Sequence, residues 1–396
     1  MKHFFCSGLS VLAAACGMTY GTLVQAASDP VSFDWNGIQV TPELMTGLTY
    51  DDNLYRDNRE ISTPVFIVKP SVDFRAISGL NEYSVQLEAT DRTYTDQHSA
   101  NSTDYGISGD VHHEFNSRNR LGLNAGWGHY FDEGSEIGST GKLPRYEKSV
   151  LGGTYGFGSK ETANIDVFAN YDDQQYRDAG FNSRSIKYYG STFYYNLMPK
   201  TDALLEISKR ELSYDDIQNA NYDITNYLVG LRWEGTAKTS GYAKAGRRYR
   251  ETDIAGIGKE GYTGWELGMS YMPLTYSVVQ LTAGRDYGLE SDNPETFDFT
   301  RGNNINLTWQ HDWTGKFSSR LGYGYTDEDV LNASGVTQKE RNVNSYNAGI
   351  DWKVDRWVTL SLDWTYTKRD ETAKQTGVFE DNYNRNTYML SGRFSL

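Results

Sequence analysis

The feature that most constrains this chain is the alternation of apolar and polar residues in short segments along nearly its whole length. The segment WVTLSLDWTYT, which begins at residue 357, shows it clearly: Leu360 and Leu362 fall on one side of an extended chain, and Ser361 and Asp363 fall on the other. Successive side chains of a β-strand point to opposite faces, so the pattern predicts strands with one apolar face. A single strand leaves open whether that face packs on a protein core or contacts lipid.

The same pattern recurs in about eighteen segments, an even number, with sixteen as the alternative count. Each segment spans roughly 10 to 14 residues, which suits a tilted strand that crosses a membrane. The segments begin near Val40, Pro64, Glu82, Thr103, Arg120, Tyr146, Ala163, Ser185, Asp202, Tyr222, Ser240, Gly261, Tyr276, Phe297, Phe317, Asn342, Trp357 and Asn384.

The connections between these segments alternate in length, which is independent information about the fold. Tight turns are predicted at 78–81, 116–119, 159–162, 198–201, 235–238 and 354–356. The connections between them are mostly longer and more polar, as at 51–63, 132–145, 177–184, 327–340 and 369–383. Short turns on one rim and long loops on the other are typical of an outer-membrane barrel, with periplasmic turns and extracellular loops. A soluble sandwich has no reason to alternate its loops in this way.

The composition fits a membrane barrel although it resembles that of a soluble protein. Mean hydropathy is -0.64 and 38% of the residues are hydrophobic. A transmembrane strand needs an apolar residue only at every second position, which lowers the average. Aromatic residues gather near the ends of the apolar faces, as Trp127 does after Leu123 and Ala125, where amphipathic rings prefer the lipid–water boundary. We therefore predict an all-β fold, namely a transmembrane antiparallel outer-membrane β-barrel.

Two arginines do not follow the expected pattern. Arg247 and Arg285 lie in similar motifs, AGRRY and AGRDY, and share parity with the alanine that faces lipid. Either each strand has passed above the hydrocarbon at that point, or a bulge shifts the register.

The N-terminus reads as a secretory signal over residues 1–26, followed by a short periplasmic lead at 27–39 and the barrel at 40–396. Lipoprotein processing at Cys16 is the alternative to cleavage after Ala26. Cleavage after Ala26 removes both cysteines, and the loss of Lys2 takes the formal charge from -14 to -15, since the segment holds no Asp or Glu. The expected location is the outer membrane of a Gram-negative cell.

The polar face of the strands predicts the residues that line the lumen. Charge is costly on the lipid face and tolerated inside, so charged residues of the polar parity are assigned inward. They are Glu43, Lys69, Asp73, Arg75, Glu88, Asp110, Asp166, Glu206, Arg210, Arg232, Lys244, Arg248, Glu266, Arg320, Asp351, Asp363 and Arg393. Opposed charges of this kind either rigidify the wall as ion pairs or offer donors and acceptors to a hydroxyl-rich solute. Tyr130, Phe168 and some tyrosines among 188–195 add possible stacking surfaces for sugar rings.

The sequence presents no catalytic constellation, metal spacing or phosphate loop, so we expect no cofactor and no enzymatic activity. His112 and His113 point to opposite faces of one strand. The acid pairs at 51–52, 172–173 and 215–216 could bind cations or act as acid and base, but solvated rim charge is the favoured interpretation. The negative charge argues against a nucleic-acid partner.

The first three strands resemble a known family. PEL at 42–44 leads to YDDNLYR at 50–56, then IVKPSV at 67–72, a tight turn, and a strand from Tyr83 to Tyr94. This is similar to the exopolysaccharide-operon outer-membrane proteins of the EpsL and VpsM kind, within the broader β-barrel porin group. The motif is specific over residues 40–95 only.

That resemblance implies export of a secreted polysaccharide, with a periplasmic polysaccharide-export lipoprotein and an inner-membrane copolymerase as partners. Outer-membrane lipid and the barrel assembly machinery are further expected partners, although Leu396 replaces the usual final Phe or Trp of the assembly signal. A general or sugar-selective diffusion porin is the alternative function; a long inward-folding constriction loop would favour it, and none is obvious in the sequence. An outer-membrane hydrolase would require an acid, base or nucleophile cluster.

Overall fold

The computed structural model describes residues 32–395 except 133–142, 179–180, 216–220, 237, 254–257, 290–298 and 333. The predicted signal, Cys16, Asp216 and Leu396 lie outside the described residues. One short 3-10 helix, η1 (His98–Ala100), accompanies the strands. The strands are β1 (Phe33–Trp35), β2 (Ile38–Asp51), β3 (Thr63–Ser78), β4 (Asn81–Tyr94), β5 (Ser102–Asn116), β6 (Asn119–Phe131), β7 (Arg145–Ser159), β8 (Ala163–Tyr176), β9 (Arg184–Met198), β10 (Thr201–Tyr214), β11 (Tyr222–Thr236), β12 (Thr239–Thr252), β13 (Glu260–Leu274), β14 (Ser277–Leu289), β15 (Phe299–Asp312), β16 (Phe317–Leu331), β17 (Thr337–Asp355), β18 (Val358–Ala373) and β19 (Tyr383–Ser395).

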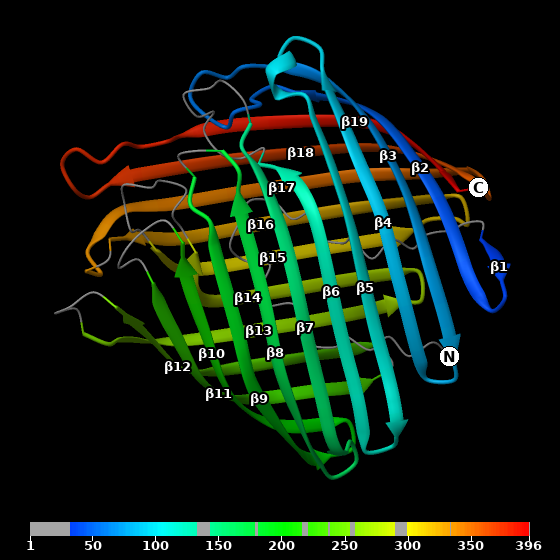
Figure 1. Cartoon of the computed structure of the whole chain (residues 1–396), viewed down its shortest axis with the longest axis vertical. Coiled ribbons are helices and arrows are strands. Elements are labelled where there is room, and N and C mark those ends of the chain that lie inside the picture. Colours follow the sequence, from blue (N-terminus) through cyan, green and yellow to red (C-terminus); the bar gives the residue numbers. More distant parts are fainter. Residues whose placement is uncertain are drawn as a thin grey trace.

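Strands β2 to β19 form one closed antiparallel barrel of eighteen strands, as the sequence predicts. Each strand pairs with its neighbours in the chain, and β19 closes the ring by pairing with β2 from Thr387↔Asp51 to Ser395↔Glu43. In Figure 1, β3 to β8 cross the barrel at a steep angle to β10 through β18, which reflects the tilt that closure requires. The alternative count of sixteen is wrong.

The alternation of connections is confirmed. Eight connections, the first between β3 and β4 and the last between β17 and β18, contain two to four residues, whereas the nine at the opposite rim contain five to thirteen. Lys200 and Gly79 adopt positive φ in two of the tight turns, which shortens the reversal to two residues. The short-turn rim lies at the lower and right side of Figure 1, together with β1 and the C-terminus.

Two predicted loops are shorter than expected, because strand residues extend into both of them. β16 and β17 remain paired up to Leu331↔Thr337, so only 332–336 connect them, and β18 continues to Ala373. Polar sequence suggested loops there, but a ladder can extend beyond the lipid, where side chains on both faces are free to be polar. Cross-strand charge pairs such as Glu328 with Arg341 then stabilise the extension.

The outer surface of the barrel is apolar across its middle and aromatic near its ends. Leu205, Ile207, Val229 and Leu231 are all exposed although hydrophobic, as lipid contact requires. Near the long-loop rim the ring of Tyr105 stacks on His129, and near the short-turn rim Trp309 and Trp313 flank His311 on the same face. These rings form the two girdles of a transmembrane barrel of the outer-membrane type. No helix in the described part of the chain is long and apolar enough to span a membrane.

The lead before the barrel contributes a strand. β1 pairs with β2 from Phe33↔Val40 to Trp35↔Ile38, below the point where β19 ends. Asn36 and Gly37 both have positive φ, as a two-residue hairpin of this hand requires. β1 therefore covers the part of the β2 edge that β19 leaves unpaired.

The two exceptional arginines are explained without a bulge. The ladders of β12 with β11 and β13 show no register shift around Arg247, which stays on the exposed outer face within the last six residues of its strand. There its guanidinium donates a hydrogen bond to the Thr263 hydroxyl (3.1 Å) and lies 5.8 Å from the Tyr249 ring centroid. Arg285 forms the last pair of the β13–β14 ladder, with Trp265. Arg247 therefore fits a strand that has left the hydrocarbon, whereas Arg285 lies where β14 leaves its ladder with β13, 5.6 Å from the Tyr262 ring centroid.

The YDDNLYR segment closes the seam between the first and last barrel strands. Asp51 is buried and accepts hydrogen bonds from the Arg385 guanidinium, Nε donating at 3.0 Å to Oδ1. Asp52 accepts from the Asn386 backbone (2.6 Å) and amide (2.8 Å). Asn53, fully buried, donates to the Asn384 carbonyl (3.0 Å). The residues that carry the family resemblance therefore hold the barrel shut at its long-loop rim.

We predict that Asp51→Asn lowers the free energy of unfolding by about 3 kcal/mol, because it takes the buried carboxylate away from the Arg385 guanidinium, whose side chain is only 11% exposed. Urea unfolding of the refolded barrel in lipid vesicles measures this. Glu340→Gln is the control, since Glu340 pairs with Lys374 (2.8 Å) at the same rim but both side chains are exposed. Its effect should stay under about 0.5 kcal/mol. Equal effects of the two changes would contradict the role of Asp51 in closing the seam.

Candidate transport lumen

Most of the charged residues assigned inward meet an opposite charge on the inner face. On neighbouring strands Glu43 pairs with Arg393 (3.1 Å) and Lys69 with Glu88 (2.8 Å). The other pairs between neighbouring strands are Arg75–Glu82 (2.7 Å), Arg232–Asp202 (2.6 Å) and Arg320–Asp351, while Arg320–Asp363 (2.6 Å) and Arg120–Asp166 each span one strand. Within the described residues Asp73 and Asp110 make no ion pair with a basic side chain.

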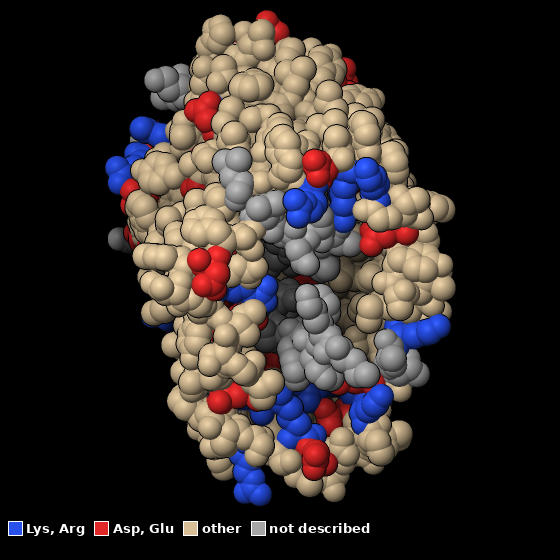
Figure 2. Space-filling model, turned by 90° about the vertical axis from the view of Figure 1, so that its right-hand side faces the viewer, with Lys and Arg blue, Asp and Glu red and all other residues tan. Residues whose placement is uncertain are grey.

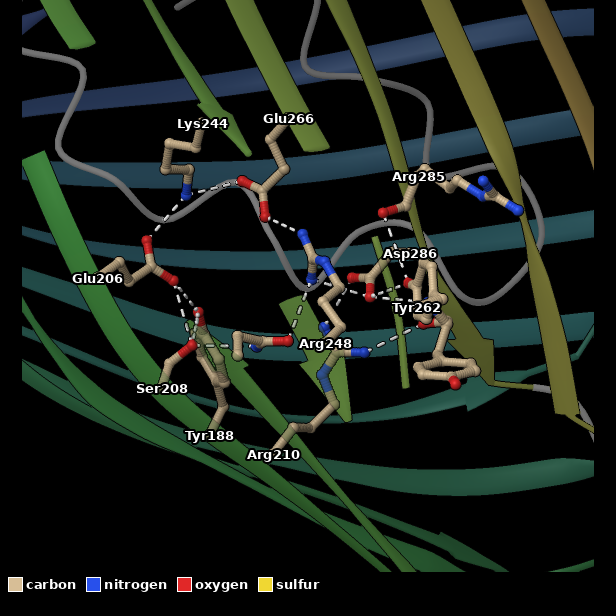
Figure 3. A network of polar contacts seen from close by, with 12 residues as sticks. Tyr188, Glu206, Ser208, Arg210, Lys244, Arg248, Tyr262, Glu266, Arg285 and Asp286 are labelled. Carbon is tan, nitrogen blue, oxygen red and sulfur yellow. Dashed lines mark hydrogen bonds and ion pairs between the residues drawn. The ribbon is translucent and has the colours of Figure 1, made fainter. Parts of the chain in front are cut away.

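Six charged side chains on β10, β12, β13 and β14 form a single chain of alternating sign, which we call the charge chain (Figure 3). It runs Glu206–Lys244–Glu266–Arg248–Asp286–Arg210, with N···O distances of 2.8, 2.7, 2.5, 2.9 and 3.2 Å in that order. The charge chain contains three cations and three carboxylates, so its net charge is zero. A network withdrawn from water requires this balance, because an unpaired buried charge is costly.

A shell of neutral donors and acceptors completes the charge chain. Ser208 and Tyr188 donate hydrogen bonds to Glu206 (3.1 and 3.3 Å), and Asn226 donates to Ser208 (3.0 Å). The Tyr262 hydroxyl donates to Asp286 (3.4 Å). The Arg248 side chain is only 1% exposed, the lowest value among the charges of the chain. The network is therefore packed into the wall and holds its members in fixed positions.

The charge chain brings together strands that a round wall would keep apart. Arg210 on β10 pairs with Asp286 on β14 and donates to the Tyr287 carbonyl oxygen (3.3 Å). Four strand spacings correspond to roughly 19 Å along a sheet. A direct hydrogen bond to the backbone means that the end of β14 leans inward toward β10. The inward lean begins after Arg285, which is the last residue of β14 that pairs with β13.

An apolar cluster fills the space between the inward-leaning end and the wall. Tyr287 packs edge-on against Tyr262 (4.5 Å between centroids) and Phe299 (5.7 Å). Arg250 lies 3.6 Å over the Phe299 ring. The other buried members are Ile186, Leu212, Tyr214, Tyr222, Ile224 and Leu331. This cluster lies at the long-loop end of β9 to β16, so the lumen is narrowed there from one side.

The opposite wall is open. On β4 to β7 the inward residues Gln86 and Asp110 are exposed, and a hollow of about 280 Å³ lies over the inner face. Figure 2 looks onto the right-hand side of Figure 1, where short turns lie, and shows a hollow in the middle of that face with basic and acidic side chains around it. The lumen is thus asymmetric: packed along β9–β14 and accessible along β4–β7.

Several inner charges were missed from the sequence. Asp286 was omitted because the register near Arg285 was left undecided. Glu371 was placed in a loop, yet its buried side chain contacts Lys339 (2.8 Å) and Arg341 (2.7 Å). Continued parity along β18 was the signal that could have found Glu371.

The histidines and paired acids form structural contacts. His113 shares a hydrogen bond with the Tyr83 hydroxyl (2.7 Å) on the outer face, and His129 and His311 belong to the aromatic girdles. Asp172 pairs with Lys148 (3.0 Å). In the part of the chain that the structure describes, no group of three or more His, Cys, Asp or Glu side chains could hold a metal ion.

Comparisons with known proteins describe the architecture only. No family model matches the sequence, and no curated protein matches it. Among solved structures the chain is similar to OpdK of Pseudomonas aeruginosa with vanillate (TM-score 0.49, 10% identity, 90% of this chain and 99% of that one). It is also similar to OccK3 of the same organism (0.47, 12%, 90% and 96%) and to its siderophore receptor PirA (0.47, 11%, 90% and 80%). None of these likenesses bears on the solute.

We predict that the charge chain stabilises the barrel only while positive and negative charges alternate along it. Lys244→Gln leaves Glu206 and Glu266 without their shared cation and should lower the free energy of unfolding by about 3–5 kcal/mol. Adding Glu206→Gln restores alternation among the four remaining charges, so the double variant should be more stable than the single one. Urea unfolding in lipid vesicles compares them. A double variant less stable than Lys244→Gln would show that the alternation of charge is not what stabilises the wall.

Proposed function

We propose that this barrel is a passive outer-membrane channel for hydrophilic solutes, with a lumen narrowed on one side by the inward-leaning end of β14. The single observation that carries the proposal is the contact of Arg210 with Asp286 and with the Tyr287 backbone across four strands. Because an ion pair holds the inward-leaning end of β14 in place, the wall itself restricts the passage of solutes, and no separate loop or plug is needed. A long inward-folding constriction loop was the expected mark of a diffusion porin; here the narrowing comes from the end of strand β14 instead of a loop.

The charge of the constriction supports a weakly selective channel. The charge chain is neutral, so it presents no strong single-sign field to a passing ion. The open wall offers amides, hydroxyls and paired charges, which suit uncharged polar solutes. Concentration differences would drive transport, since a fixed lumen supplies no energy.

Export of a secreted polysaccharide remains a prediction that rests on the resemblance over residues 40–95. In this chain the matching residues Asp51, Asp52 and Asn53 close the barrel seam. That structural role does not depend on which solute the barrel transports. Export would further involve the periplasmic lipoprotein and the inner-membrane copolymerase. Polymer trapped in the periplasm after gene deletion, and released on complementation, would favour export over diffusion.

The channel proposal predicts that Arg210→Gln combined with Asp286→Asn increases single-channel conductance by tens of per cent or more, because the end of β14 is no longer tied to β10. Planar bilayer recording of the purified barrel measures this. The matched control is Arg75→Gln with Glu82→Gln, a pair on adjacent strands whose loss leaves the wall in place.

Three outcomes separate the alternatives. Larger conductance in the first variant alone supports the constriction. Identical conductance in both variants means that the inward-leaning end does not limit passage. A wild-type barrel that inserts and shows no conductance overturns the channel proposal.

A further inference from the structure

We propose that the open wall of the lumen binds neutral oligosaccharides along an aromatic run that leads into the inner hollow; the inference deepens the proposed channel function by naming its solute class. The run consists of Tyr130 on β6, Tyr146 on β7, Tyr176 on β8 and Phe181 in the following loop. Successive ring centroids lie 5.6, 5.4 and 5.4 Å apart. Each residue is half-buried, so part of each side chain stays exposed.

The run lies on the inner face. The register pairs Tyr130 with Tyr146 and Tyr146 with Tyr176, so the three share one side of the sheet. The other side carries the outer girdle, with Tyr105 and Trp127 exposed beside the same strand ends. Because the upper ends of β6, β7 and β8 adjoin long connections, the run occupies the long-loop mouth of the lumen.

Glycine gives Tyr130 its place against the wall. A Cβ at Gly128 would come within 2.7 Å of the hydroxyl oxygen and two ring carbons of Tyr130, and one at Gly106 within 2.9 Å of the same hydroxyl. The ring therefore lies flat along the backbone of two strands, which a larger residue at either position would prevent. A flat ring at the edge of a hollow is a platform for a planar partner.

Polar anchors fix the upper rings. The Tyr176 hydroxyl donates to Asp132 (3.0 Å) and accepts from the Gln174 amide (2.9 Å). Tyr176 also lies nearly parallel to Phe181, with 23° between the ring planes. Rings held in this way bind a ligand without losing further rotamer freedom.

The hollow continues the run toward the membrane interior. Its lining includes Tyr130 at the upper edge and the polar side chains of Gln86, Glu88, Asp110 and Asn124, with Ser108, Lys148, Gly106 and Gly126 among the remaining lining residues. Its volume of about 280 Å³ is close to the lower limit of small-molecule pockets, roughly 300 Å³. Within the described chain Asp110 makes no ion pair, so its carboxylate remains an acceptor for hydroxyl groups.

This combination matches the chemistry of a sugar. The axial C–H groups of a pyranose form an apolar face with partial positive charge, which packs on the negative face of an aromatic ring. The equatorial hydroxyls point sideways, where carboxylates and amides accept and donate hydrogen bonds. A row of rings at regular spacing also provides equivalent binding positions for successive sugar units, so an oligosaccharide can move along the run in small steps.

Binding and conduction are measured separately, so that failure of one is distinguishable from failure of the other. Isothermal titration calorimetry on the folded barrel in detergent uses an α-1,4-linked glucose hexamer and its β-1,4-linked counterpart as probes. Planar bilayer recording then measures block of the ion current by the same hexamers.

We expect binding of at least one hexamer, weakened about tenfold by Tyr130→Ala, which corresponds to about 1.4 kcal/mol. Tyr130→Phe should retain most of the affinity, because the ring and not the hydroxyl carries the contact. Gly126→Val should also weaken binding by filling the hollow, where a Cβ meets only ordinary contacts at 3.6 and 3.8 Å. The control is Tyr171→Ala, which removes a ring from the outer face of β8 and should leave binding unchanged.

The outcomes are distinct. Wild-type binding of neither hexamer overturns the sugar site even if the barrel conducts ions. Binding that Tyr130→Ala leaves unchanged overturns the assignment of the run. Binding without any ion current supports the sugar site and overturns the channel.

Discussion

Closure of the sheet is the constraint on which everything else in this molecule depends. Lipid offers no hydrogen bonds, so each backbone amide within the membrane must find its partner inside the protein. Here the ladder between β19 and β2 supplies the last of those partners, and Asp51, Asp52 and Asn53 secure it at the long-loop rim. Closure also sorts the side chains, since alternate residues must face lipid or lumen. The apolar outer face and the charged inner face are two results of the same requirement.

Charge inside the barrel follows a second rule, which is local neutrality. Inner arginines and lysines meet carboxylates at hydrogen-bonding distance on neighbouring strands, and the charge chain extends this over four strands to Asp286. The consequence is mechanical as well as electrostatic, because Arg210 holds the end of β14 toward β10. One wall thus becomes packed while β4–β7 stays open, and a solute would meet glycine, amide and tyrosine surfaces there.

Much of this architecture could be predicted from the sequence, because period-two alternation and loop length are both local signals. Seventeen of the eighteen barrel strands begin within two residues of the predicted position; β17 begins at Thr337 instead of near Asn342. The failures occur where no lipid enforces alternation. The polar ends of β16 to β18 looked like loops, and Asp286 was missed because the register near Arg285 was left undecided. The hairpin of β1 was readable from Asn36-Gly37 and was overlooked. The inward lean of β14 depends on partners four strands away, which no local pattern encodes.

The most direct test of the central claim is the ion current through single wild-type barrels in a planar bilayer, recorded over a range of salt concentrations. The account predicts stepwise insertions with a conductance that rises in proportion to bulk conductivity, as a water-filled lumen requires. Insertion verified by protease protection, with a current no greater than that of the lipid alone, would show that the lumen is closed and would contradict the account.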